Sequence, residues 1–361
     1  MNTQADGHPA AASRAVEPGA AEPRPGDAED ARGARRLLLI AGGAYIGVTA
    51  VLVAVFGELL VSRDVVFVWL MGLLFILSLN NRRRYFRGLL VDWLPFIAFL
   101  FAYDFARSIA DTTGIAPHYT EMIRIDRILF GSPIPTVYLQ DHFYHPPAAA
   151  WYDYAAWVTY ITHFFGTLAL AVVLWRFAYP LFKRWRTLVM WLSAAGFTTY
   201  VLFPAAPPWL AAQHGRIGFV HKIKDEMFAH TGTKSITSAI ENKWVDAVAA
   251  VPSLHAAFPF MMTLLFWHRG WKWRIPFGLY ALAMGTALVY TGEHYAADVL
   301  LGYVYALVTF LLVSVYWRRK ERRAAERAAE ARAAPGTPVP APGEPTPQPV
   351  TYSVGPASPR D

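Results

Sequence analysis

Two short polar clusters stand out in a chain that is otherwise strongly apolar. Residues 251–255 read Val-Pro-Ser-Leu-His, and residues 293–298 read Glu-His-Tyr-Ala-Ala-Asp. Both clusters lie at the edges of hydrophobic segments, where polar and ionisable groups are costly to place without a function. His255, His294 and Asp298 are therefore candidate catalytic residues, and Ser253 is a candidate substrate-binding residue.

The second cluster predicts an imidazole supported by a carboxylate. His294 and Asp298 are four residues apart, so in a helix they would lie on one face, one turn apart. A carboxylate bonded to one imidazole nitrogen fixes the tautomer and leaves the other nitrogen basic. A histidine prepared in this way can act as a nucleophile or as a general base.

The first cluster predicts an anion site at the start of a helix. Ser253 stands at the position of an N-cap, and His255 lies just inside the helix. Helix starts present free N–H groups and a partial positive charge, which suit a phosphate. Together the two clusters suit phosphoryl transfer, in which one imidazole attacks phosphorus and the other protonates the leaving oxygen.

Two other interpretations of these residues stay open. Each histidine can be structural, and Asp298 can simply pair with a neighbouring helix. His255, His294 and Asp298 could also supply three ligands to a metal ion, although Ser253 would then have no role. Their occurrence together favours phosphoryl transfer that needs no metal or other cofactor.

The composition indicates an all-α, polytopic membrane helix bundle. Hydrophobic residues make up 55% of the chain and charged residues 16%, and the apolar runs have membrane-spanning length. The net charge of +7 does not indicate a nucleic-acid partner, because much of the basic excess lies beside apolar runs. The chain has no cysteine, which excludes disulfides and thiolate chemistry.

The chain divides into five predicted segments. They are a disordered cytoplasmic tail (1–36), N-terminal transmembrane helices (37–107), an extracytoplasmic loop (108–149), a catalytic transmembrane core (150–317) and a basic, then Pro-rich cytoplasmic tail (318–361). About eight spans are expected, at 37–61, 65–80, 89–107, 150–178, 187–204, 254–268, 275–291 and 295–317.

The basic residues predict the orientation in the membrane. They gather at residues 32–36, 82–87, 183–186, 269–274 and from 318 onward. With eight spans all five groups fall on one face, which is cytoplasmic by the positive-inside rule and carries both termini. Ser253, His255 and His294 then share the opposite, extracytoplasmic face.

The two clusters resemble signature motifs of a known family. Pro252-Ser253-x-His255 followed by His294-x-x-x-Asp298 is similar to the second and third motifs of the type-2 phosphatidic acid phosphatase superfamily. Residues 203–209, Phe-Pro-Ala-Ala-Pro-Pro-Trp, resemble the branch that contains fungal inositol phosphorylceramide synthase and its bacterial relatives. The resemblance covers roughly residues 150–317.

The resemblance implies a role for each residue. His294 would form a phosphohistidine, Asp298 would orient it, His255 would act as the general acid and Ser253 would hydrogen-bond the phosphate. Two cationic features of the larger phosphatase branch are missing: Leu288 stands where an arginine is expected, and the lysine–arginine pair has no clear counterpart. The candidates to replace these cations are Arg107, Arg124, Arg127, Arg216, Lys222, Lys224, Lys234 and Lys243.

Three further residues are candidates for substrate binding, and each could have a structural role instead. Arg107 follows Asp104 by three residues near the outer end of a span, so it can form a structural salt bridge or face the site. His163 lies within a span, where it is either buried and hydrogen-bonded or lines the substrate cavity. Arg216 is either a surface charge or part of the phosphate clamp.

The predicted function is phosphoester transfer on a phospholipid or lipid-linked phosphate in the bilayer, at the outer face of the cytoplasmic membrane. The branch resemblance favours transfer of inositol phosphate to a lipid acceptor. One alternative is hydrolysis of a lipid phosphate or polyprenyl diphosphate, since water can also attack a phosphohistidine. The other is a non-catalytic lipid carrier or membrane scaffold, which the missing cations leave open.

Overall fold

The computed structural model describes residues 27–56, 69, 72–76, 87–108, 115–231 and 248–333. All regular elements in these residues are helical, which confirms the predicted all-α class. The elements are α1 (Asp27–Phe56), η1 (Leu89–Trp93), α4 (Leu94–Ser108), α5 (Glu121–Phe130), α6 (Pro135–Phe143), α7 (Trp151–Phe177), α8 (Tyr179–Leu202), α9 (Pro208–Gln213), α10 (Ile223–His230), α12 (Leu254–Phe266), η3 (Trp267–Arg269), α13 (Trp271–Tyr290) and α14 (Ala296–Ala333).

Helices occupy the predicted spans that the structure describes, and their ends differ most from the prediction at three places. Helix α1 begins inside the predicted tail 1–36, and α8 begins before residue 187. Helix α14 continues past residue 317, because the Ala/Arg/Glu-rich segment that follows consists of strong helix formers. The predicted span 65–80 lies largely outside the described residues.

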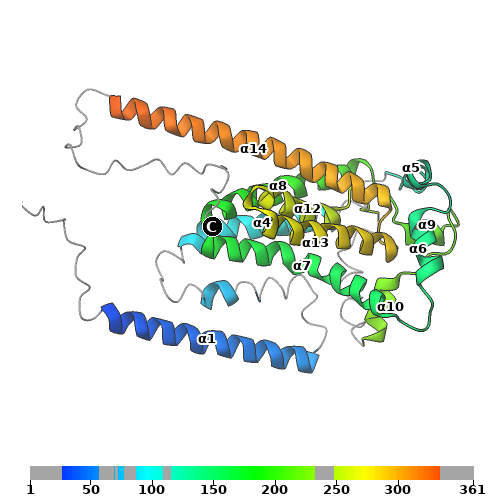
Figure 1. Cartoon of the computed structure of the whole chain (residues 1–361), viewed down its shortest axis with the longest axis horizontal. Coiled ribbons are helices and arrows are strands. Elements are labelled where there is room, and N and C mark those ends of the chain that lie inside the picture. The colour runs from blue at the N-terminus through cyan, green and yellow to red at the C-terminus, as the bar shows by residue number, and fades with distance from the viewer. Residues whose placement is uncertain are drawn as a thin grey trace, which may run out of the picture.

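Helix α12 forms the centre of the bundle. It packs against α7, α8, α13 and α14, and its own sequence is almost entirely apolar. The short helices α5, α6, α9 and α10 gather at one end of the bundle, on the right in Figure 1. We call this group of four helices the cap.

Length and apolar composition single out few membrane-crossing helices. Among the described helices, Ala296–Glu330 meets both requirements, and Trp151–His163 with Phe165–Phe177, bent by 52°, meets them when taken as one span. Helix α12 has 13 residues and is about 20 Å long, shorter than the roughly 30 Å of hydrocarbon in a bilayer. The described helices therefore yield one or two spans by this measure, where the sequence predicts about eight.

The outer surface of the bundle is apolar. Large hydrophobic side chains are exposed along the outward faces of the long helices, among them Val173, Phe177, Trp191, Leu279, Leu282, Leu307, Leu311 and Leu312. Only 28% of the most apolar stretch of α14 is buried, whereas an apolar core helix of a soluble protein would be mostly buried. The bundle thus presents to its surroundings the kind of surface that soluble proteins avoid.

The proline-rich stretch 203–209 ties the cap to the bundle. The Ala206 N–H donates to the His118 carbonyl at 2.9 Å, and the Ala205 N–H donates to the Val248 carbonyl at 2.7 Å. The Phe203 ring stacks on the His118 ring with 3.9 Å between centroids. The chain that leads into residues 251–255 is therefore held beside the cap.

Gly302 allows α14 to approach the start of α12. A Cβ atom at Gly302 would lie 2.3 Å from the Ser253 carbonyl oxygen, closer than any side chain tolerates. One turn earlier, the Asp298 carbonyl accepts a hydrogen bond of 3.1 Å from the Ser253 N–H. These contacts set the first polar cluster against the beginning of α14.

Replacing Gly302 with alanine should therefore disturb both stability and the site. Because the new methyl group meets backbone, the helices must separate, and we expect a loss on the order of 3 kcal/mol. Thermal unfolding of the purified protein in detergent should show a midpoint lowered by several degrees. Gly278→Ala on α13 is the matched control, since its Cβ would have its nearest neighbour at 3.9 Å; an equal loss in both variants would contradict this account.

Candidate active site

The two polar clusters meet where α12 and α14 begin and α13 ends. His294 Nε2 lies 3.4 Å from His255 Nδ1, and His294 Nδ1 lies 3.5 Å from Asp298 Oδ2. Ser253 and Asp298 have no exposed surface, and His294 is 5% exposed. The structure thus brings together the four residues that the sequence singles out, with His294 between a second imidazole and a carboxylate.

His294 is not part of a helix, which corrects the expected helical register. Helix α14 begins at Ala296, and Gly292 ends α13 at φ +79°, a conformation that glycine adopts without strain. The chain therefore turns before His294. The Asp298 carboxylate folds back to accept the Tyr295 N–H at 3.0 Å, as the acidic residue of a capping box does. Asp298 therefore contacts His294 although His294 precedes the helix.

Ser253 is the N-cap of α12, as its position predicts. Its hydroxyl accepts a hydrogen bond of 3.3 Å from the Ala256 N–H. His255 consequently lies in the first turn, where backbone N–H groups lack partners within the helix and favour an anion. The hydroxyl can donate its own proton while it caps the helix.

Two residues of α7 surround the His255 ring. The Tyr160 ring stacks on it at 5.5 Å between centroids with an interplanar angle of 19°. The His163 ring lies 4.0 Å from it. The structure therefore brings the predicted candidate His163 into contact with the site, where it packs against His255.

Asp126 belongs to no recognised motif, yet it holds the start of α14. Its carboxylate accepts the N–H groups of Ala296 and Ala297 at 3.2 and 2.8 Å. Burial raises its pKa to about 6, and the nearby Asp298 adds to this, although the two N–H donors act in the opposite direction. The signal in the sequence was an acidic residue on the buried face of an amphipathic helix.

Gln140 and Glu226 fix α10 against the site. The Gln140 amide donates to the carbonyls of Tyr290 and His221 at 2.8 and 3.0 Å, and its oxygen accepts the His221 N–H at 2.8 Å. Tyr144 donates to the Glu226 carboxylate; burial first and this carboxylate second raise the pKa of Tyr144, so it stays a neutral donor. The cap therefore presents α10 to the turn that carries His294.

The other predicted candidates lie elsewhere. Arg216 is exposed between α9 and α10. Arg107 is in α4, but its side chain is outside the described residues, as are Lys234 and Lys243.

Within the described part of the chain no three His, Cys, Asp or Glu side chains are placed to share a metal ion. His294 lies between His255 and Asp298, so these three side chains do not converge on one point.

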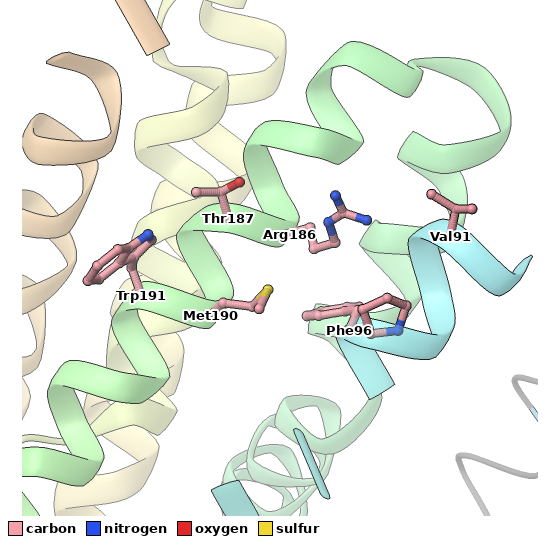
Figure 2. A pocket seen from close by; sticks show the side chains of 7 residues that line it. Val91, Phe96, Arg186, Thr187, Met190 and Trp191 are labelled. Carbon is pink, nitrogen blue, oxygen red and sulfur yellow. The ribbon is translucent and has the colours of Figure 1, made fainter. Parts of the chain in front are cut away.

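A cavity of about 290 Å³ lies apart from the histidines, between α8 and the segment η1–α4. Figure 2 shows Arg186 and Met190 of α8 facing Phe96 across it, and Val91 and Trp191 also line it. Arg186 donates to the carboxylate and the carbonyl of Asp92 at 3.1 and 3.0 Å. None of the four site residues lines this cavity.

A histidine pair with a supporting carboxylate beside a helix start has the groups that phosphoryl transfer through a histidine nucleophile requires. Residues 120–312 match the family model of the PAP2 superfamily. This range covers more than half of the chain, so the chain belongs to that superfamily, and the resemblance seen in the motifs is confirmed. Membership places it among enzymes that transfer or hydrolyse phosphoesters.

One curated relative has a named activity. The phosphoinositol dihydroceramide synthase of Bacteroides thetaiotaomicron is 29% identical over 252 residues, which cover 62% of this chain and 76% of that protein. No solved structure matches the chain significantly.

Asp126→Asn should remove a pH dependence of folding. The pKa of Asp126 is raised from 3.8 to about 6, so the folded protein holds this proton more tightly than the unfolded chain. The stability from this group is therefore fully present below about pH 4 and is lost as the pH rises through about 6.

Thermal unfolding of wild type and Asp126→Asn between pH 4 and 7 measures this effect. The difference between the unfolding midpoint of wild type and that of Asp126→Asn should decrease as the pH rises from 4 to 7. Asp141→Asn, at an exposed position of α6, is the control and should show no such trend. A wild-type minus Asp126→Asn difference that is constant with pH would contradict the prediction.

Proposed function

We propose that this chain is a membrane phosphotransferase that moves a phosphoinositol headgroup from a phospholipid to the hydroxyl of a ceramide-type lipid. The observation that carries the proposal is His294, held between Asp298 and His255 in a member of the PAP2 superfamily. The likeness to a phosphoinositol dihydroceramide synthase supports the choice of donor and acceptor.

The first step transfers the headgroup to the enzyme. Asp298 Oδ2, which lies 3.5 Å from His294 Nδ1, keeps the ring proton on Nδ1 and so leaves the lone pair on Nε2. Nε2 attacks phosphorus, the bond from phosphorus to the diacylglycerol oxygen breaks, and His255 gives that oxygen a proton. The Asp298 carboxylate offsets the positive charge that forms on the His294 ring.

The second step transfers the headgroup to the acceptor. His255, now neutral, takes the proton of the acceptor hydroxyl while its oxygen attacks phosphorus. The phosphorus–nitrogen bond breaks, and His294 regains its lone pair. In both steps the Ser253 hydroxyl and the first turn of α12 bind the phosphoryl oxygens.

Hydrolysis of a lipid phosphate or diphosphate would share the phosphohistidine and differ only in the attacking group. The near-complete burial of Ser253, His294 and Asp298 supports transfer, because it limits the entry of water to the intermediate.

The distribution of charge supports a site on the extracytoplasmic face of the cytoplasmic membrane. Basic residues lie at the opposite end of the bundle, at the start of α8 and in the turn between α12 and α13. Arg184 of α8 contacts Glu321 of α14 at 2.8 Å, which joins the start of α8 to the basic second half of α14. By the positive-inside rule that end is cytoplasmic with both termini, and the exposed apolar faces lie against lipid.

His294→Ala should abolish transfer, and Asp298→Asn should lower kcat on the order of 10⁴-fold, because the tautomer of His294 is no longer fixed. The assay uses vesicles that contain the protein, radiolabelled phosphatidylinositol and a ceramide. His142→Ala, an exposed histidine of α6, is the matched control and should keep wild-type activity.

The products separate the alternatives. A labelled ceramide product together with an acid-labile phosphohistidine on wild type supports transfer. Free inositol phosphate formed regardless of ceramide would indicate a hydrolase instead. A protein that forms neither product nor adduct with phosphatidylinositol, phosphatidate or a polyprenyl diphosphate would fit a lipid carrier.

A further inference from the structure

The site lacks the cations that the larger phosphatase branch would place in it. Leu288, at the position of the expected arginine, is fully buried and packs with Met284 and Val289 in an apolar cluster. A phosphoryl group that gains charge in the transition state nevertheless needs cationic or hydrogen-bonding partners. The partner must therefore come from another part of the fold.

Lys224 reaches the site from α10. Its Nζ lies 3.6 Å from Glu293 Oε1, in the residue directly before His294, and 3.7 Å from Asp225 Oδ1. The same Nζ lies 5.5 Å from the centre of the Tyr160 ring, which stacks on His255. One ammonium group is thus adjacent to the immediate neighbours of both site histidines.

Burial distinguishes Lys224 from the other cations of the cap. It is 6% exposed, whereas Arg124, Arg127 and Arg216 are exposed to solvent. Lys222 is partly exposed and is engaged by Asp225 at 2.9 Å and by the Trp209 ring at 3.9 Å. A buried ammonium is costly to desolvate, so its position beside the histidines calls for a function.

We propose that Lys224 binds the phosphate of the substrate, and that Glu293 is one of its partners while the site is empty. The inference rests on the proposed phosphohistidine chemistry and names the cation that this chemistry needs. Glu293 Oε1 is buried and accepts no hydrogen bond from the described residues, and its contact with Lys224 is longer than a hydrogen bond. A phosphate oxygen can therefore come between Glu293 and the ammonium group without breaking a hydrogen bond between these two residues.

Binding of orthovanadate, a mimic of the phosphoryl-transfer transition state, tests this assignment without requiring turnover. Titration of the purified full-length protein should show an affinity lowered on the order of 100-fold in Lys224→Met. Lys224→Arg keeps the charge and should stay within about tenfold of wild type. Lys222→Met, two residues away, is the matched control and should bind as wild type does.

A second variant separates phosphate binding from a structural ion pair. Lys224→Met leaves Glu293 buried without its cation, so the double variant Lys224→Met/Glu293→Gln should regain thermal stability. If Lys224 binds phosphate, the double variant still binds orthovanadate weakly. The proposal would be overturned if folded Lys224→Met or the folded double variant bound orthovanadate with wild-type affinity. It would also be overturned if the wild-type protein showed no measurable binding of orthovanadate.

The outcome is independent of the overall reaction. Wild type that binds orthovanadate through Lys224 but turns over no lipid would contradict the proposed function and leave the phosphate site standing. Wild type that transfers headgroups with unchanged kcat/KM after Lys224→Met would leave the proposed function standing and remove Lys224 from it.

Discussion

The arrangement of the site depends on Asp298, which acts through both its side chain and its backbone. Its Oδ2 accepts the Tyr295 N–H and meets His294 Nδ1, while its carbonyl accepts the Ser253 N–H. One residue therefore begins α14, orients one imidazole and fixes the helix that carries the other. Asp126 takes up the next two N–H groups, so both buried carboxylates are stabilised by a helix start.

Local patterns were enough to predict most of the helices and the meeting of the two clusters. Helix α7 was expected at 150–178 and runs from Trp151 to Phe177. A long apolar run consists of consecutive residues, so its length can be read directly from the sequence. Counting spans placed His255 and His294 at one end of the bundle. The register of His294 was wrong, because the spacing of four suggested a helix where Gly292 instead ends one.

The parts of the site that could not be predicted are contacts between distant segments. Asp126 and Ala297 are 171 residues apart, and Gln140 and Tyr290 are 150 apart. When a side chain caps a helix in a distant part of the chain, no periodic pattern in the sequence indicates which two residues will meet. In the sequence, Lys224 was one of several basic residues predicted to lie on the extracytoplasmic side. Only the structure shows that it is buried and lies beside Glu293.

Helix α14 runs without a break from the candidate active site to its basic second half. From Ala296 to Arg318 it rises about 33 Å, close to the roughly 30 Å of hydrocarbon in a bilayer. In the proposed orientation, with the arginines that begin at Arg318 among headgroups on one side, His294 would lie at the level of the lipid phosphates on the other. The length of this helix would then match the thickness of the bilayer, so that a lipid could bring its phosphorus to the imidazole without leaving its own leaflet.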